Sequence, residues 1–216
     1  MPLFYQHTIN ETTKLGIWHI EEAEDFFLHK VPVQQNITHP HKRLQHLAGR
    51  FLLKYLFPDF PHAEILIADT RKPYLPNEQY HFSISHCGNY AAAMVSSTHR
   101  VGIDIEIASE KVERVAHKFI HESEQQFFAN SEQLAVNSSL FSDPRLLFTI
   151  MWSAKESLFK WYSLGKVDFK EHMQLIDPIQ QQNGSLVLPF CFKKNKPVYL
   201  NITAKIFDEL VLSWVV

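Results

Sequence analysis

The sequence predicts an α+β fold built from two similar halves. Two long segments, at 41–57 and 145–162, have the apolar spacing of amphipathic helices. Short alternating or β-branched segments, typical of strands, lie on both sides of each helix. Each half begins with a strand, continues with a long helix and ends with further strands. The boundary between the two halves lies near His99. We therefore expect an N-terminal half at 1–98 and a C-terminal half at 99–216.

Most of the other expected elements are short strands. They are predicted at 15–21, 63–68, 80–84, 91–96, 101–108, 175–176, 186–192, 198–206 and 209–215. Shorter helices are expected at 22–29, 112–119 and 122–128, and a polar loop is expected at 130–144. An Asn183-Gly184 pair, which favours a tight turn, should join strands 175–176 and 186–192.

A weak internal repeat underlies the two halves. Leu15-Gly16-Ile17 is matched by Val101-Gly102-Ile103, and residues 48–55 are similar to residues 154–161. A chance similarity between two apolar helices is the alternative explanation for the second match.

The C-terminal long helix, residues 145–162, has recognisable boundaries. Asp143 suits the N-cap position, and Pro144 suits the first helical position. Gly165 lies just beyond the expected end. The stripe that should face the core consists of Leu147, Ile150, Met151, Ala154, Leu158 and Trp161.

Three charged residues interrupt this apolar helix. They are Lys155, Glu156 and Lys160, of which Glu156 and Lys160 are one turn apart and share a face. The simplest interpretation is a solvated face with one weak ion pair, because such exposed pairs are common. A second interpretation, a catalytic face, depends on the strand considered next.

The segment 101–108 alternates strictly, as a half-buried strand does. Asp104 and Glu106 therefore stand on one face, roughly 7 Å apart along the strand. Like charges at this spacing repel one another unless a cation lies between them, and a hard divalent cation prefers such oxygen ligands. The alternative is an ordinary polar face without metal.

Four segments together resemble the 4′-phosphopantetheinyl transferases, and most closely their larger, monomeric Sfp-like branch. Two of them are Gly-Ile-Asp-Ile-Glu at 102–106 and Trp-Ser-Ala-Lys-Glu-Ser-Leu-Phe-Lys at 152–160. The others are Arg-Lys-Pro-Tyr-Leu-Pro at 71–76 and His-Phe-Ser-Ile-Ser-His-Cys-Gly at 81–88. Each segment alone is weakly specific, whereas four in the family's order and spacing are a strong signal.

The resemblance implies a fold, an activity and a partner. The fold would be a pseudo-dimer of two similar α/β halves, with the active site in the cleft between them, and we expect a monomer. The chain would transfer the 4′-phosphopantetheine arm of coenzyme A to a serine of an apo acyl or peptidyl carrier protein, releasing adenosine 3′,5′-bisphosphate. Two alternatives share parts of this pattern: another metal-dependent phosphoryl enzyme, such as a nucleotide pyrophosphatase, and a non-catalytic module that binds carrier proteins.

The resemblance also assigns roles around the phosphates. Asp104, Glu106 and Glu156 would hold Mg²⁺, with Mn²⁺ as a possible substitute. Glu156 would also act as general base on the carrier serine, directly or through water. Lys160 would stabilise the leaving oxygen, and Lys155 would hold phosphate. Trp152 would pack against the pantetheine arm, unless it is simply a core aromatic residue.

The nucleotide of coenzyme A should contact the N-terminal half. By resemblance, Lys72 and Pro73 line the adenine region, and Ser85 and His86 contact phosphate. In the family, an arginine on the first long helix binds the 3′-phosphate of coenzyme A. Arg43 is the first candidate for this role and Arg50 is the second. The alternative for each arginine is an ordinary surface charge.

Composition excludes several classes of partner. A net charge of −2 gives no general basic surface for nucleic acid or a membrane. No apolar run is long enough to span a bilayer, and the N-terminus does not read as a signal peptide. The two cysteines form no disulfide framework, which fits the cytoplasm. The clustered His39, His41 and His46 match no zinc spacing.

Overall fold

The computed structural model describes residues 3–32, 37–127 and 143–216. Its fold is mixed α and β, which confirms the predicted class. Backbone contacts divide the chain into two compact units, Met1–Ile105 together with Val216, and Glu106–Val215. The division falls inside strand β7 (Gly102–Ile107).

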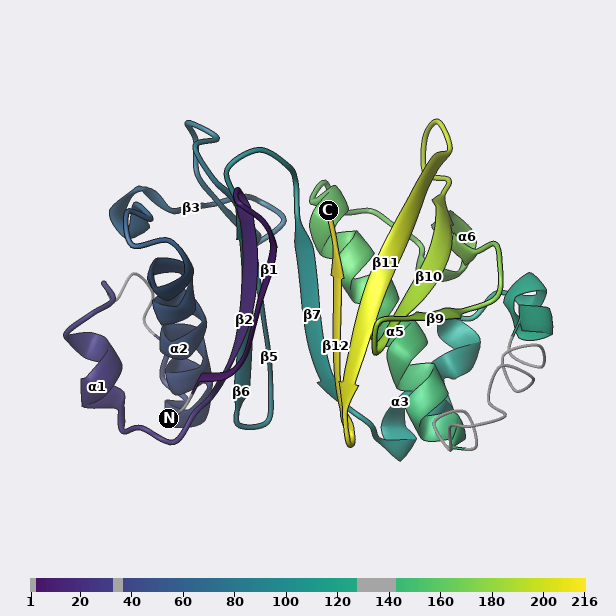
Figure 1. Cartoon of the computed structure of the whole chain (residues 1–216), viewed down its shortest axis with the longest axis horizontal. Coiled ribbons are helices and arrows are strands. Elements are labelled where there is room, and N and C mark those ends of the chain that lie inside the picture. The colour runs from purple at the N-terminus through teal and green to yellow at the C-terminus, as the bar shows by residue number, and fades with distance from the viewer. Residues whose placement is uncertain (1–2, 33–36, 128–142) are drawn as a thin grey trace. The chain divides into compact units, whose positions relative to one another are not determined.

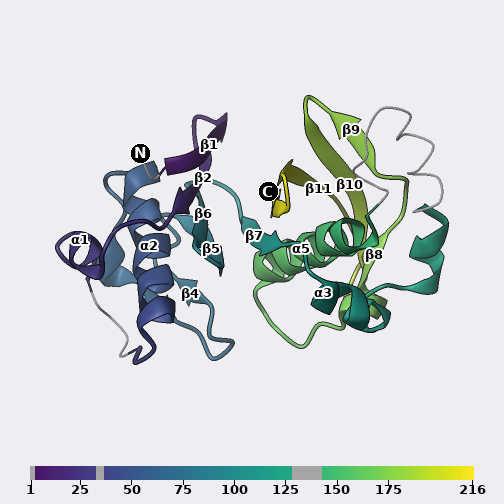
Figure 2. The same cartoon turned by 90° about the horizontal axis from the view of Figure 1, so that it is seen from below.

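The first unit is built on an antiparallel sheet of four strands, in the order β1-β2-β6-β5. Helix α2 lies across one face of this sheet, and helix α1 packs against α2 (Figures 1 and 2). The bounds are β1 Leu3–Asn10, β2 Thr13–His19, α1 Glu24–Leu28, α2 Pro40–Leu56, β5 His81–Cys87 and β6 Tyr90–Ser96. A 3-10 turn and a small ribbon complete the unit: η1 His62–Glu64, β3 Leu66–Ile67 and β4 Pro73–Tyr74.

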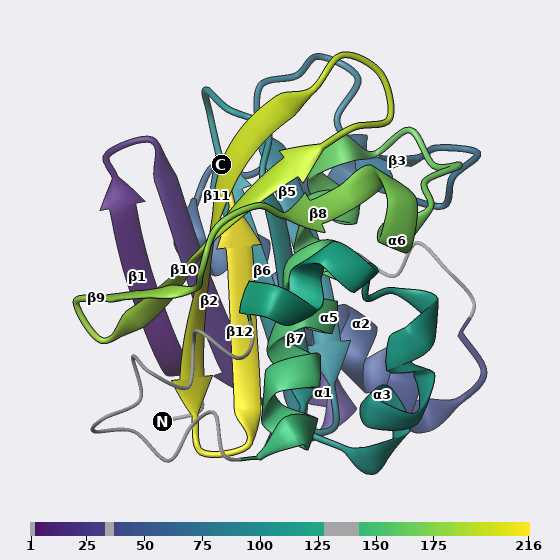
Figure 3. The ribbon, with the colours of Figure 1, turned by 90° about the vertical axis from the view of Figure 1, so that its right-hand side faces the viewer.

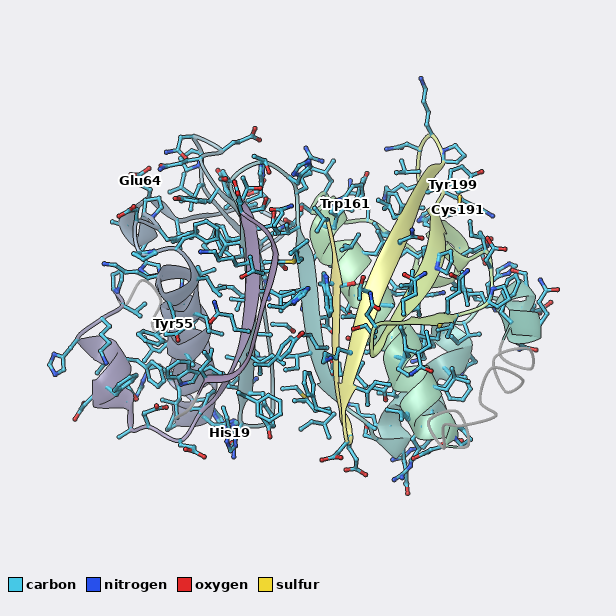
Figure 4. The ribbon with its side chains drawn as sticks, in the orientation of Figure 1. His19, Tyr55, Glu64, Trp161, Cys191 and Tyr199 are labelled. Atoms are coloured by element: carbon cyan, nitrogen blue, oxygen red, sulfur yellow. The ribbon has the colours of Figure 1, made fainter. Side chains whose placement is uncertain are left out.

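Helix α2 is fixed at its N-terminus and along its inner face. The ring of His39 accepts a hydrogen bond from the backbone N–H of Lys42 at 3.4 Å, and Pro40 occupies the first helical position. At Gly49 the helix approaches β5 so closely that an added Cβ would lie 2.6 Å from Cγ2 of Ile84. The core between helix and sheet includes Leu47, Leu52, Leu53, Phe27 and Phe82. Tyr55, labelled in Figure 4, meets the ring of Trp18 edge-on at 5.8 Å between centroids.

The second sheet has the strand order β7-β12-β11-β10-β8, and β9 pairs with β10. Helix α5 packs on β12 and β11, and α3 lies beside α5 (Figure 3). The helical bounds are α3 Glu110–Val115, η2 Ala116–Lys118, η3 Glu122–Glu124, α5 Pro144–Tyr162 and α6 Phe169–His172. The strand bounds are β8 Met173–Leu175, β9 Gln180–Gln182, β10 Ser185–Phe192, β11 Val198–Phe207 and β12 Leu210–Val215.

Helix α5 confirms its sequence prediction to within one residue. The side chain of Asp143 accepts the N–H of Arg145 at 2.9 Å, and Pro144 is the first helical residue. The helix ends at Ser163, whose φ of 73° is left-handed. All of the predicted inner stripe is buried except Trp161, which is half-buried and lies edge-on to Phe192 at 6.4 Å.

Several predicted elements differ in the structure. The strand predicted at 63–68 is shortened to β3, because His62–Glu64 forms a 3-10 turn. Asn183 and Gly184 do form a turn with positive φ. The turn joins β9 to β10, whereas the sequence predicted that it joins the strand at 175–176 to β10, so that connection was wrong. Strand β1 was not predicted, because its mostly exposed residues lack apolar alternation. The loop predicted at 130–144 lies almost entirely outside the described residues.

None of the helices within the described residues combines the length and the hydropathy that crossing a bilayer requires.

Candidate active site

Strand β7 carries a carboxylate that is tied to β5. Asp104 is 2% exposed, and its Oδ1 accepts a hydrogen bond from the Ser85 hydroxyl at 2.8 Å. Nearby, the N–H of Ile103 donates to Oγ of Ser83 at 3.2 Å. The polar face of β7 is therefore buried at Asp104, where the sequence predicted a half-buried strand. The structure brings the Ser85 segment and the Asp104 segment into direct contact.

The second carboxylate of β7 is linked to α5. The indole N–H of Trp152 donates to Oε1 of Glu106 at 3.3 Å. Glu156 follows Trp152 by one helical turn and so lies on the same side of α5. Glu106 and Glu156 are both half-buried. Trp152 thus places Glu106 against the helical face that carries Glu156.

The predicted metal ligands are oxygen donors from a strand and a helix. Carboxylates of this kind suit Mg²⁺, which binds oxygen and retains non-protein ligands. Among the described residues, however, no group of three or more His, Cys, Asp or Glu side chains is gathered closely enough to hold a metal ion. The donor chemistry of Asp104, Glu106 and Glu156 fits the ion, and their role as its ligands stays a prediction.

Lys155 lies where it does not support the predicted phosphate contact. Its side chain is fully buried, and its ammonium lies 2.8 Å from Oε2 of Glu124. It also donates to the carbonyls of Phe119 at 2.6 Å and Phe169 at 3.2 Å. Burial lowers the pKa of this ammonium, and the Glu124 carboxylate opposes that shift. The simplest interpretation of the sequence is a solvated face for this lysine, but a buried partner holds Lys155 inside the unit.

A pocket of about 700 Å³ lies beside Glu156 in the second unit. Its aromatic walls include Phe119, Trp152 and Phe169, with ring centroids of Trp152 at 5.1 Å from Phe119 and 5.5 Å from Phe169. Lys118 and Lys166 contribute cationic groups to its lining. A largely apolar pocket with a few polar groups is typical of a small-molecule site.

Lys160 occupies the last turn of α5 and is half-buried. It lies one turn beyond Glu156, as predicted, so the two side chains share a helical face. Glu156 and Lys160 are both half-buried, whereas a solvated face with a surface ion pair would expose them fully.

The two candidate arginines on α2 have different surroundings. Arg43 forms a bidentate pair with Glu24 of α1, with both N–O distances at 2.7 Å. Arg50 is 2% exposed, and its Nε donates to Nε2 of His46 at 2.8 Å. The Arg50 carbonyl lies 2.7 Å from Nε2 of His62. Arg43 is thus engaged by a carboxylate, whereas Arg50 contacts a histidine, and the assignment of the anion-binding arginine stays a prediction.

The remaining nucleotide candidates also belong to the first unit. On β5, Ser85 is buried and the next residue, His86, is exposed, so their side chains point to opposite faces of the sheet. His86 contributes to the electrostatic shift at His46, so it lies near the Arg50 pair. Lys72 and Pro73 are half-buried at the start of β4. Burial lowers the pKa of His81 on β5, and Lys72 is among the charges that add to this shift.

We expect the folded protein to lose stability as pH falls from about 6.5 to about 4. Burial, then the charges of Arg50 and His86, lower the pKa of His46 from 6.5 to about 4. In that window the unfolded chain binds the proton more readily, so acid favours unfolding, by up to about 3 kcal/mol from this group. Urea unfolding of His46→Asn should show a flatter pH dependence than the parent protein. His117→Asn, a change at an exposed histidine of η2, is the control and should leave the slope unchanged.

Sequence reasoning assigned no role in the site to three of these residues, and it considered His46 only as a zinc ligand. His46 lies one turn before Arg50 on α2, a spacing that could have indicated the pair. His62 and Glu124 had no local signal, because their partners are distant in sequence.

Comparison with known proteins adds independent information. The model of the 4′-phosphopantetheinyl transferase superfamily matches residues 100–213. Enterobactin synthase component D of Escherichia coli (strain K12) is 35% identical over 122 residues, covering 55% of this chain and 54% of that protein. The 4′-phosphopantetheinyl transferase gsp of Aneurinibacillus migulanus is 34% identical over 125 residues, covering 56% and 48%. The chain spans about half the length of the relatives it matches.

Proposed function

Because the chain belongs to the 4′-phosphopantetheinyl transferase superfamily, we propose that it transfers the phosphopantetheine arm of coenzyme A to a carrier protein. The acceptor is a serine of an apo acyl or peptidyl carrier protein, and adenosine 3′,5′-bisphosphate is the second product. The observation that carries the proposal is the Ser85–Asp104 contact, which joins two family motifs in one place. The relative from Aneurinibacillus migulanus is named for this transferase activity.

We place the chain in the Sfp-like branch, acting as a monomer in the cytoplasm. Its two compact units have nearly equal lengths, 1–105 and 106–215, which suits a pseudo-dimer. Cys87 and Cys191 form no disulfide within the described residues, which suits a reducing compartment. The slightly acidic charge of −2 offers no basis for binding nucleic acid or a membrane.

The reaction needs positioning and charge stabilisation more than covalent chemistry. The carrier serine oxygen attacks the β-phosphorus of coenzyme A, and the bond to the bridging oxygen of the nucleotide phosphate breaks. Glu156 accepts the serine proton, and Lys160 donates to the leaving oxygen. Asp104, Glu106 and Glu156 would hold Mg²⁺, or Mn²⁺ in its place, which neutralises phosphate charge when bound. The pocket at Trp152 receives apolar parts of the pantetheine arm.

Binding of coenzyme A should depend on its 3′-phosphate and on Arg50. Arg50 and the exposed His86 make a cationic region in the first unit, and Lys72 and Pro73 would line the adenine. Loss of a charge-assisted hydrogen bond costs roughly 1.5–3 kcal/mol, or about ten- to a hundredfold in affinity. We therefore expect calorimetry to show weaker binding of 3′-dephospho-coenzyme A, and weaker binding of coenzyme A by Arg50→Gln.

Arg43→Gln provides the matched comparison for this prediction. It removes a guanidinium from the same helix, but one that is paired with Glu24. Equal affinities for the two forms of coenzyme A would show that the pocket is wrongly assigned. If Arg43→Gln alone weakened coenzyme A binding, Arg43 and not Arg50 would be the residue that binds the 3′-phosphate.

One assay separates the proposed function from its alternatives. The protein is incubated with coenzyme A, Mg²⁺ and an apo carrier protein, and the carrier is then weighed by mass spectrometry. A transferase adds the mass of the phosphopantetheine arm. A nucleotide pyrophosphatase would cleave coenzyme A without changing the carrier, and a binding module would leave both unchanged.

A further inference from the structure

We propose that Lys155 and Glu124 form an interior ion pair that positions the pocket walls and Glu156 for transfer, without contacting the substrate. This inference rests on the proposed function, because it assigns positioning residues to that same site. It gives a role to Glu124, which lies outside the four segments that carry the family resemblance.

The ammonium of Lys155 is fully engaged inside the second unit. It has three hydrogens to donate, and three acceptors surround it: the Glu124 carboxylate and the carbonyls of Phe119 and Phe169. Phe119 and Phe169 both line the pocket beside Glu156. Lys155 therefore connects α5 directly to the backbone of two aromatic wall residues.

Glu124 extends the network to further segments. It is 0% exposed, and its Oε2 also accepts the N–H of His121 at 2.7 Å. Its Oε1 accepts the N–H of Leu175 in β8 at 2.8 Å. Each carboxylate oxygen thus has a backbone donor, and Oε2 also contacts the Lys155 ammonium. A buried charge is tolerated when it is paired and hydrogen-bonded in this way. The pair joins the 119–124 segment, α5 and β8 around one point.

The consequence for the site follows from helical geometry. Lys155 immediately precedes Glu156, so successive side chains project from α5 about 100° apart. When Lys155 is held in the interior, the rotation of α5 about its axis is fixed, and Glu156 is directed to the pocket that it lines. The same contacts hold the backbone of Phe119 and Phe169, whose rings both pack against Trp152.

A direct phosphate contact by Lys155 makes a different prediction. To reach a phosphate, its ammonium would have to leave all three acceptors and abandon a buried carboxylate, which is strongly unfavourable. Removing Lys155 alone has the same effect on Glu124 under either interpretation. A single substitution therefore does not distinguish them, whereas a compensating double substitution does.

The decisive comparison is Lys155→Met against Lys155→Met/Glu124→Gln. In the single variant the Glu124 carboxylate loses its cation. In the double variant the glutamine carbonyl can accept the N–H of Leu175 and its amide can donate to the Phe119 carbonyl, so the N–H of His121 alone loses its acceptor. Lys111→Met, a change at an exposed lysine of α3, is the matched control for loss of one lysine. Each protein is measured by thermal melting and by kcat and KM for coenzyme A.

We expect Lys155→Met to melt earlier and to lose kcat by roughly ten- to a hundredfold, because small displacements of catalytic groups carry costs of this size. The double variant should recover much of the lost melting temperature and most of kcat, with KM for coenzyme A close to that of the parent, because it removes the uncompensated charge and gives up only the His121 hydrogen bond. A double variant that melts normally but remains slow, or shows a raised KM, would overturn the inference and restore the phosphate contact. A double variant no more stable than the single one would overturn it too, because the two residues would not act as a pair. An inactive parent protein would refute the proposed function, while the melting comparison would still test the pairing.

Discussion

Asp104→Asn should lower the rate of phosphopantetheine transfer by at least about a hundredfold, with a melting temperature close to that of the parent protein. Asparagine has nearly the same shape as aspartate, and its carbonyl oxygen can still accept the Ser85 hydroxyl that lies 2.8 Å away. What it removes is the negative charge, and with it a strong oxygen donor for a divalent cation. Steady-state kinetics over a range of Mg²⁺ concentrations and a thermal melt measure the two effects separately.

Ser85→Ala is the control for the local hydrogen bond. It removes the hydroxyl donor but leaves the Asp104 carboxylate in place, so kcat should fall much less, and loss of the proposed phosphate contact should appear in KM for coenzyme A. A near-normal rate for Asp104→Asn in Mg²⁺ would contradict a catalytic role for this carboxylate. It would favour a purely structural role on β7.

Lys160→Ala should reduce kcat by roughly a hundredfold or more, and Glu156→Gln by at least as much. Both groups are expected to interact most strongly as charge develops on the serine and leaving oxygens, so their contribution belongs to the transition state. Glu156→Gln removes both a proton acceptor and a metal ligand. Its apparent requirement for Mg²⁺ should therefore rise, which Lys160→Ala should not cause.

Thermal melts of these two variants test the surface-pair interpretation. An exposed ion pair is worth under about 1 kcal/mol and affects stability alone. If both variants melted earlier but transferred phosphopantetheine at the parent rate, Glu156 and Lys160 would be a structural pair. We expect the opposite: nearly unchanged melting and a large loss of rate.

The elements nearest the candidate site were the most predictable ones. Helix α5 follows from local chemistry, because Asp143 and Pro144 satisfy its first turn and the apolar stripe repeats at helical spacing. Strand β7 follows from its alternation, and the motifs on both elements indicated Asp104, Glu106 and Glu156. By contrast, β1 is an edge strand with mostly exposed residues, and its pairing with β2 supplies what its sequence pattern does not show.

Side-chain partners far apart in sequence could not be predicted. Lys155 has the same local spacing whether it faces solvent or the interior, and its partner Glu124 is 31 positions away. The choice between Arg43 and Arg50 likewise depended on Glu24 of α1, which is 19 positions from Arg43. Burial and pairing of charges are decided by tertiary contacts, so periodicity alone could not assign them.

The packing of α2 on β5 restricts which residues position 49 can accept. Even a methyl group there would lie 2.6 Å from Cγ2 of Ile84, so the helix, the strand or that side chain would have to move. A displacement of the backbone would carry Arg50 on α2 away from Ser85 and His86 on β5. A residue without a side chain thus sets the spacing between the proposed coenzyme A contacts. Selection for ligand binding would then act on Gly49 through its size, although the residue offers the ligand no functional group.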